Sequence, residues 1–238
     1  MKIETINITE SLRNVVTEKE KSLLQLMSEF QNQYKAITFA TSMGAEDMLI
    51  THALSKINSP IEIFTLDTGR LHQETYDLIS EVNQNYSKQI KVYSPSSNDV
   101  ENYVSVYGIN DFYNSLESRK ECCRVRKIEP LKRALNGKDA WITGIRSEQS
   151  ITRSDTKLID RDPTFNLDKI SPLLDWTEDE VWAYIKMNDV PYNKLHDHFF
   201  PSIGCEPCTR AISMGEDVRA GRWWWENPEH KECGLHKK

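Results

Sequence analysis

The stretch AITFATSMGAEDMLITHALSKI, residues 36–57, decides the fold class of this chain. The short apolar run over 36–41 predicts a buried strand, and the segment over 45–57 predicts a helix. Three turn-forming residues, SMG, separate the two. A strand that passes through a tight turn into a helix is the unit from which parallel α/β sheets are built.

The same pattern recurs farther along the chain. The segment PIEIFTL (60–66) predicts a second strand, followed after DTG by a helix over HQETYDLISEVNQNY (72–86). The segments KQIKVYS (88–94) and DAWITGI (139–145) predict two more strands, with a long, mostly helical stretch between them. We therefore expect an open, mainly parallel twisted α/β sheet with helices on both faces.

Helices are also predicted on either side of these strands. Apolar residues at helical spacing over 11–33 predict one or two amphipathic helices. The segment 177–189 predicts another, because Thr177 and Glu180 match the S/T-x-x-E capping box. Turn-forming residues after this helix predict irregular structure.

Composition describes a soluble, mildly acidic protein. The chain has 238 residues, 38% of them hydrophobic, and a formal net charge of −6. This charge does not favour nucleic-acid binding, since such domains are more often basic. The N-terminal residues lack the apolar region of a secretory signal, and no run is long enough to span a membrane. We expect a cytoplasmic protein without a nucleic-acid or membrane partner.

The turn after the first strand is a candidate anion site. Ligands of open α/β sheets bind beyond the carboxyl ends of the strands, so Ser42, Gly44 and the first amides of the next helix could hold a phosphate. The G-K-[ST] ending of a Walker A loop is missing. A tight turn with a simple helix cap remains an equal alternative.

The five cysteines divide into four and one. Cys122 and Cys123 are adjacent in KECCRVRK, Cys205 and Cys208 form a C-x-x-C, and Cys233 stands alone near the end. Two tight pairs are typical of a zinc site or an iron–sulfur cluster, with buried inert thiols as the alternative. The adjacent pair favours a cluster, whose separate irons can each take one thiolate.

Basic residues gather around the cysteines despite the acidic total. They indicate either a solvated helix face or an anionic substrate held by charge-assisted contacts. Cys233 is flanked by basic residues that lower the pKa of a thiol, which makes it either a nucleophile or an accident of spacing. His196 and His198 could be ligands but are interpreted as structural or surface residues, and the three tryptophans 223–225 as core or interface residues. The basic residues in question are Arg119, Lys120, Arg124, Arg126, Lys127, Arg146, Arg153, Arg219 and Arg222.

Seven segments in register make the chain, from about residue 36 to the end, resemble the assimilatory adenylyl-sulfate / phosphoadenylyl-sulfate reductases of the iron–sulfur type. One residue differs from the usual pattern of the first segment, where Met43 replaces Phe. The segments are TSMGAED, LDTGRLHQETY, KECCRVRKIEPL, WITGIRSEQSITR, GCEPCTRAI, EDVRAGRWWWE and ECGLH.

The resemblance implies a fold of the adenine-nucleotide α-hydrolase-like type. It implies a single nucleotide-binding reductase domain over residues 1–225 and a mobile C-terminal tail over 226–238 that carries Cys233. It also implies a [4Fe-4S] cluster on Cys122, Cys123, Cys205 and Cys208. The phosphosulfate would be held by Lys127, Arg219, Arg222 and His236. The nucleotide pocket would be lined by Ser42, Gly44, Leu66, Gly144 and Arg153.

The implied reaction is the reduction of adenylyl sulfate to sulfite and AMP in sulfate assimilation. Cys233 would carry an S-sulfocysteine intermediate, and a thioredoxin or glutaredoxin-type dithiol would release sulfite. The 3′-phosphorylated nucleotide is the alternative substrate. A tRNA-thiolating ATP pyrophosphatase and a non-catalytic iron–sulfur redox sensor are more distant alternatives. The sequence leaves formation of a homo-oligomer open.

Overall fold

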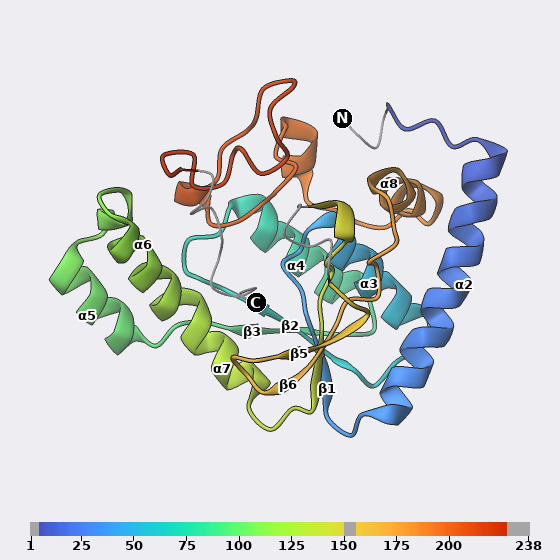
Figure 1. Ribbon diagram of the computed structural model, residues 1–238, viewed down its shortest axis with the longest axis horizontal. Helices are drawn as coiled ribbons and strands as arrows, with labels where there is room; N and C mark the ends of the chain where they lie inside the picture. The colour runs from blue at the N-terminus through green and yellow to red at the C-terminus, as the bar shows by residue number, and fades with distance from the viewer. Residues whose placement is uncertain (1–4, 150–155, 228–238) are drawn as a thin grey trace.

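The computed structural model describes residues 5–149 and 156–227. A six-stranded sheet with the order β3-β2-β1-β4-β6-β5 forms its centre (Figure 1). All neighbouring strands are parallel except β5 and β6, which form an antiparallel hairpin. The strands are β1 (Ile37–Ala40), β2 (Glu62–Leu66), β3 (Ile90–Tyr93), β4 (Ala140–Ile142), β5 (Ile159–Asp162) and β6 (Leu167–Ile170).

The central strands are rich in apolar residues because they are buried on both faces. Successive side chains of a strand point to opposite faces of the sheet. In β2, Ile63 packs into the larger core on one face, and Phe64 packs into a smaller cluster on the other. In β4, Ile142 and Trp141 divide in the same way. The sheet therefore needs helices on both sides.

Four helices cover one face and enclose the larger core. The longest, α2, buries Val16, Leu23, Met27 and Phe30 along one side, as its helical spacing predicts. It runs beside α3 and α8 in Figure 1. The predicted capping box of α8 is present, with the side chains of Thr177 and Glu180 each accepting a backbone hydrogen bond. These helices are α2 (Glu10–Gln33), α3 (Ala45–Lys56), α4 (Gln73–Asn85) and α8 (Glu178–Met187).

The long stretch between β3 and β4 supplies the other helices. They lie together on the opposite side of the molecule in Figure 1, and α7 packs Leu131, Ala134 and Leu135 onto the sheet. A π-helical turn, η2, joins α6 to α7 directly after the cysteine pair. Such turns occur frequently at functional sites. The helices are α5 (Ser97–Tyr107), α6 (Leu116–Cys123), η2 (Arg124–Ile128) and α7 (Glu129–Leu135).

The predicted fold class is confirmed, including the four parallel strands and the helices between them. The β5–β6 hairpin was not predicted, and it extends the sheet beyond β4. Between α8 and residue 227 the chain is mostly irregular, as expected, with short 3-10 turns that include η5 (Lys194–His198) and η6 (Glu206–Cys208). Within the described residues, no helix combines the length and apolar character required to cross a bilayer.

Candidate active site

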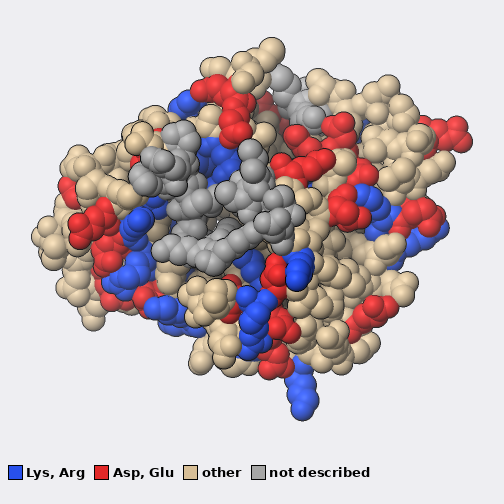
Figure 2. Space-filling view, viewed as in Figure 1, with Lys and Arg blue, Asp and Glu red and all other residues tan. Residues whose placement is uncertain are grey.

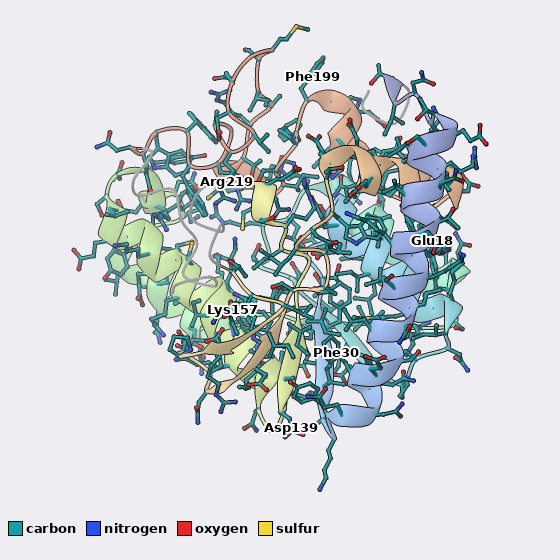
Figure 3. All side chains as sticks on the ribbon, turned by 45° about the vertical axis from the view of Figure 1, so that its right-hand side comes forward. Glu18, Phe30, Asp139, Lys157, Phe199 and Arg219 are labelled. Atoms are coloured by element: carbon teal, nitrogen blue, oxygen red, sulfur yellow. The ribbon has the colours of Figure 1, made fainter. Side chains whose placement is uncertain are left out.

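The strand order reverses its direction at β1. Strands β2 and β3 follow on one side of β1, whereas β4, β6 and β5 lie on the other. In open α/β sheets a ligand binds beyond the carboxyl ends of the strands at such a reversal. Figure 3 shows Arg219 and Phe199 at this end of the molecule, opposite Asp139, which precedes β4.

A cavity of about 590 Å³ opens at this end of the sheet. Its walls come from the loops after β1, β2 and β4, from η2, and from the loops that follow α8. It brings together every predicted substrate residue that lies within the described part of the chain. These are Ser42, Gly44, Leu66, Lys127, Gly144, Arg219 and Arg222.

Asp47 shapes the loop after β1. It lies in the first turn of α3, and its carboxylate accepts hydrogen bonds from the Ser42 amide (2.5 Å) and the Ser42 hydroxyl (2.6 Å). The backbone amide of Gly144 donates to the same carboxylate. Burial raises the pKa of Asp47 to about 6, although these hydrogen bonds favour the ionised form. Asp47 thus joins two loops that line the cavity.

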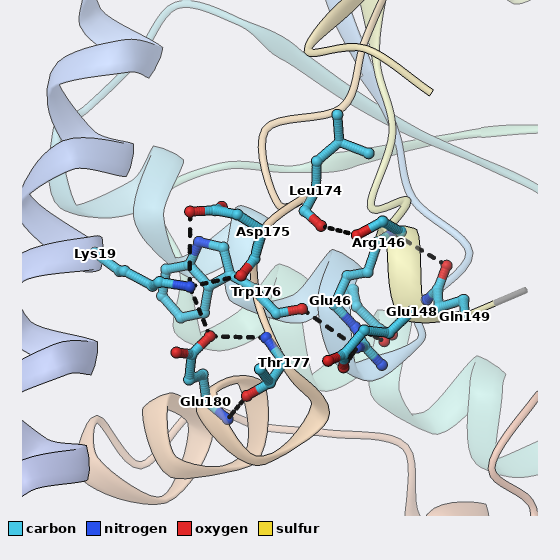
Figure 4. Close-up of polar contacts among 11 residues, drawn as sticks. Lys19, Glu46, Arg146, Glu148, Gln149, Leu174, Asp175, Trp176, Thr177 and Glu180 are labelled. Carbon is cyan, nitrogen blue, oxygen red and sulfur yellow. Dashed lines mark hydrogen bonds and ion pairs between the residues drawn. The ribbon is translucent and has the colours of Figure 1, made fainter. Parts of the chain in front are cut away.

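A second polar group stands on the α8 side of the cavity. Arg146, which is buried, donates from Nε to Glu46 at 2.8 Å and from Nη1 to the Trp176 carbonyl at 3.3 Å (Figure 4). Glu148 lies 3.2 Å from the same guanidinium. The charge of Arg146 is therefore matched by carboxylates, which leaves this wall without excess positive charge.

Three basic residues also belong to the cavity lining. They are Lys127 from η2 and Arg219 and Arg222 from the C-terminal loop, and together they form the basic wall of the cavity. Arg222 is buried and donates to the Ser202 hydroxyl (3.3 Å) and the Ile203 carbonyl (3.1 Å). Figure 2 shows further basic side chains along the α6 and α7 side of the visible face. An anionic end of a ligand is best accommodated at this wall.

Four cysteines surround a second, much smaller cavity. Cys122 and Cys123 end α6, whereas Cys205 precedes η6 and Cys208 ends it, and all four are buried free thiols. Their common surroundings are aromatic and basic. The other residues of this cavity are Arg70, Phe112, Arg119, Arg126, Lys127, Pro207 and Trp223.

The residues around the cysteines fit an anionic group with several acceptor atoms. Arg126 Nε and Trp223 Nε1 are buried and lack a hydrogen-bond partner among the described residues. Burial and the neighbouring Cys205 raise the pKa of Cys208 to about 12, so positive metal charge would be needed to hold it as thiolate. Within residues 5–149 and 156–227, no three His, Cys, Asp or Glu side chains enclose a position for one metal ion.

Two polar side chains support the C-x-x-C segment. Arg126 Nη1 donates to the Thr68 carbonyl at 2.7 Å, and the Thr68 hydroxyl lies 3.3 Å from Cys205 Sγ. Thr68 belongs to the loop after β2, which also lines the larger cavity. Lys127 and Cys205 belong to the walls of both cavities, so the two sites share a boundary.

Three predicted residues, Arg153, Cys233 and His236, lie outside the described residues. Two residues of the site were missed in the sequence. Asp47 could have been noticed as an acidic residue in the first turn of a helix, whose amides attract carboxylates. Trp223 was interpreted as a core or interface aromatic; it is buried, and it also borders the cysteines.

Comparison with known proteins agrees with this geometry. An adenosine 5′-phosphosulfate reductase of Allochromatium vinosum is 54% identical over 92% of this chain and 86% of its own length. One of Burkholderia cepacia is 50% identical over 92% and 87%. The crystal structure of phosphoadenylyl-sulfate reductase from Candida auris has a TM-score of 0.67 and 25% identity, covering 84% of this chain and 97% of that one.

A yeast FAD synthetase with a TM-score of 0.56 and 14% identity, matched over 88% of this chain and 71% of its own, shares the fold alone. The family of the phosphoadenosine phosphosulfate reductase domain matches residues 36–211. With this match, these relatives and the arrangement of the two cavities, the chain belongs to the phosphoadenosine phosphosulfate reductase family.

Proposed function

We propose that this protein reduces adenylyl sulfate to sulfite and AMP, with Cys233 as nucleophile and a thioredoxin-type dithiol as reductant. The observation that carries the proposal is the shared boundary of the two cavities. Lys127 faces both the large cavity and the four cysteines. A nucleotide-sized site that ends in basic side chains beside a cysteine group suits a phosphosulfate substrate.

The large cavity offers separate places for the two ends of the nucleotide. Its inner part contains Phe64, Leu66 and Trp141, which suit the adenine ring. The phosphosulfate would lie at the wall of Lys127, Arg219 and Arg222. Their charge would offset the repulsion between an attacking thiolate and the anionic substrate, and it would stabilise the departing phosphate.

The proposed reaction has two steps. The Cys233 thiolate attacks the sulfonyl sulfur, an S–S bond forms, the bond from sulfur to the phosphate oxygen breaks, and AMP leaves. A thiolate of the reduced dithiol then attacks Cys233 Sγ and releases sulfite. The second thiol of the reductant resolves the mixed disulfide. The dithiol loses two electrons and the sulfonyl sulfur gains two, so no other redox partner is required.

We propose a [4Fe-4S] cluster on Cys122, Cys123, Cys205 and Cys208. Four separated thiols and two unpaired buried donors, Arg126 Nε and Trp223 Nε1, support this assignment. The bound cluster would hold the C-x-x-C segment against α6 and place its charge beside Lys127. The thiol chemistry accounts for both electrons, so we assign the cluster a structural and electrostatic role.

Adenylyl sulfate is preferred here over its 3′-phosphorylated form. Relatives at about half identity over more than four-fifths of their length carry the name adenosine 5′-phosphosulfate reductase. The structural neighbour named for the 3′-phosphorylated nucleotide is more distant, at 25% identity. The carboxylates around Arg146 agree with this preference, since they offer a further phosphate no excess positive charge.

The test is sulfite release by anaerobically purified protein with reduced thioredoxin and each nucleotide in turn. Cys233→Ser should retain its iron and release no sulfite. In single turnover without reductant, the wild type should gain one SO₃ group on Cys233, detected by mass spectrometry. Iron-loaded protein that forms neither sulfite nor S-sulfocysteine would contradict the proposal and favour a redox sensor or a thiolating enzyme.

A further inference from the structure

A buried ion pair lies next to the four cysteines. Arg119 is 1% exposed and sits one turn before Cys122 and Cys123 on α6. Its guanidinium donates to Glu226 through Nε (2.8 Å) and Nη2 (2.7 Å). The side chains of the two residues are 2% and 8% exposed. A two-pronged pair of this kind fixes orientation as well as distance.

Arg119 contacts the cysteine site in two further ways. Its guanidinium lies 4.9 Å from the centre of the Trp223 ring, whose centre is also 4.7 Å from the Arg222 guanidinium. Arg119 also forms a hydrogen bond with Cys123. One side chain therefore touches a cysteine of the proposed cluster, a tryptophan in the cluster cavity and a carboxylate in the C-terminal segment.

Glu226 is the first residue of 226–238, the C-terminal segment that carries Cys233. Cys233 follows it by seven positions. A chain of that length places Cys233 within about 25 Å of Glu226, whatever conformation it adopts. The position of Glu226 thus limits the region that Cys233 can reach. Arg219 and Arg222 lie immediately before Glu226, in the same segment that lines the large cavity.

We propose that Arg119 is a positioning residue which, through Glu226 and Trp223, fixes the origin of the segment carrying Cys233 relative to the cysteine site and Arg222. This inference rests on the proposed function. It explains how a cluster that transfers no electrons would still affect catalysis. The cysteines hold α6 and the C-x-x-C loop together, and Arg119 extends that rigid unit to the base of the nucleophile's segment.

Substituting either member of the Arg119–Glu226 ion pair should have an energetic cost. Removing one partner of a buried ion pair leaves the other charge without compensation. Glu226→Gln keeps the size and the acceptor oxygen but removes the negative charge. We therefore expect the C-terminal segment to detach from Arg119 while the sheet and the large cavity, which Glu226 does not line, stay intact.

The chain offers a matched control for this variant. Arg210 and Glu216 form a two-pronged ion pair in the same C-terminal region, at 2.8 and 2.9 Å, but their side chains are 38% and 33% exposed. Surface pairs contribute little to stability. Glu216→Gln therefore repeats the chemical change without removing a buried charge.

The experiment compares wild type, Glu226→Gln and Glu216→Gln as iron-loaded full-length proteins. Iron content and AMP affinity should stay within about twofold of wild type in both variants. The single-turnover rate of S-sulfocysteine formation at saturating adenylyl sulfate should fall by ~10²-fold in Glu226→Gln, as expected for a misplaced reacting group. Limited proteolysis should cut the C-terminal segment of this variant sooner. Glu216→Gln should match wild type throughout.

Two results would overturn the inference. One is an unchanged S-sulfocysteine rate in Glu226→Gln. The other is a joint loss of iron, AMP affinity and rate, which would mean that the pair only stabilises the fold. If Glu226→Gln does not fold, Arg119→Lys replaces it, because lysine keeps the charge but not the two-pronged contact. Wild type that forms no S-sulfocysteine would instead refute the proposed function, and the inference with it.

Discussion

Asp47 occupies the space that a side chain on Gly144 would need. A Cβ atom on Gly144 would overlap the Asp47 carboxylate and also approach Glu46 Cβ at 3.1 Å. The loop after β4 can therefore approach α3 only because residue 144 is glycine. The close contact brings together the two loops on either side of the reversal in strand order.

Gly144→Ala should destabilise the protein by about 1–3 kcal/mol, the usual cost of overfilling a packed site. Gly44→Ala is the comparison, since its Cβ would lie 3.3 Å from the Ser42 hydroxyl, a tight contact that a small shift can relieve. Urea unfolding of the two variants measures the difference. Equal losses would contradict the assigned role of Asp47.

Asp47 should make stability depend on pH. Its pKa is raised by burial to about 6, from an ordinary 3.8. Between these values the folded state retains a proton that the unfolded state has lost, so the free energy of unfolding contributed by Asp47 falls as pH rises through this range. Urea titrations of wild type and Asp47→Asn from pH 4 to 7 should show a difference that declines and levels off above about pH 6. A difference that rises over this range would refute the assignment.

Removing the hydroxyl group of Thr177 should show how much the capping box of α8 contributes to stability. The Thr177 hydroxyl accepts from the Glu180 amide at 3.2 Å, and Glu180 also pairs with Lys19 at 2.8 Å (Figure 4). Thr177→Ala should cost about 1 kcal/mol of stability, whereas Thr177→Ser should cost much less. Denaturant midpoints give both values. A serine variant as unstable as the alanine variant would point to lost packing instead.

Gly204→Ala should weaken anion binding by displacing Arg222. A Cβ atom on Gly204 would stand 2.5 Å from Arg222 Nη2, so the guanidinium would have to move. Losing one charged hydrogen bond corresponds to roughly tenfold or more in AMP affinity. Calorimetric titration with AMP measures this change in affinity. In Gly44→Ala the added methyl group makes only a mild contact. This variant therefore shows how much AMP affinity is lost when a methyl group is added elsewhere in the cavity.

The five cysteines should separate into two classes. Cys208→Ser should lose most of its iron, because its thiol would no longer complete the set of four. Cys233→Ser should keep wild-type iron and visible absorption while losing S-sulfocysteine formation. Iron analysis beside intact-mass measurement distinguishes them. Full iron content in Cys208→Ser would remove this residue from the proposed ligands.

The sequence predicted the parallel strands because their apolar runs and turn residues are local signals. The strand Ile37–Ala40 and the helix that follows it could be predicted from the period of the hydrophobic pattern alone. The β5–β6 hairpin escaped notice because charged residues such as Asp160 and Arg161 interrupt its pattern. Its stability comes from pairing with β4, a contact that no local window contains.

Within the site, residue type alone drew attention to the two cysteine pairs and Lys127, because thiols and basic residues in tight spacing are unusual. The structure places them around two adjoining cavities, and their roles stay predictions. The contact of Asp47 with Ser42 and the pair of Arg119 with Glu226 were not predicted. Glu226 lies far from Arg119 in the sequence, and folding alone brings the two together. The π-helical turn η2 likewise depends on packing and has no simple sequence pattern.

The separation of the cysteine pairs also sets an order of events during synthesis. Closing a loop of roughly 80 residues between Cys123 and Cys205 is entropically costly until the sheet between them has folded. Strands β4 and β6 and helix α8 all lie within that loop. A growing chain therefore exposes its first cysteine pair long before the second exists. On the proposed cluster assignment, all four cysteines could bind iron only after Cys208 has been synthesised, so assembly of the site would follow the folding of the sheet.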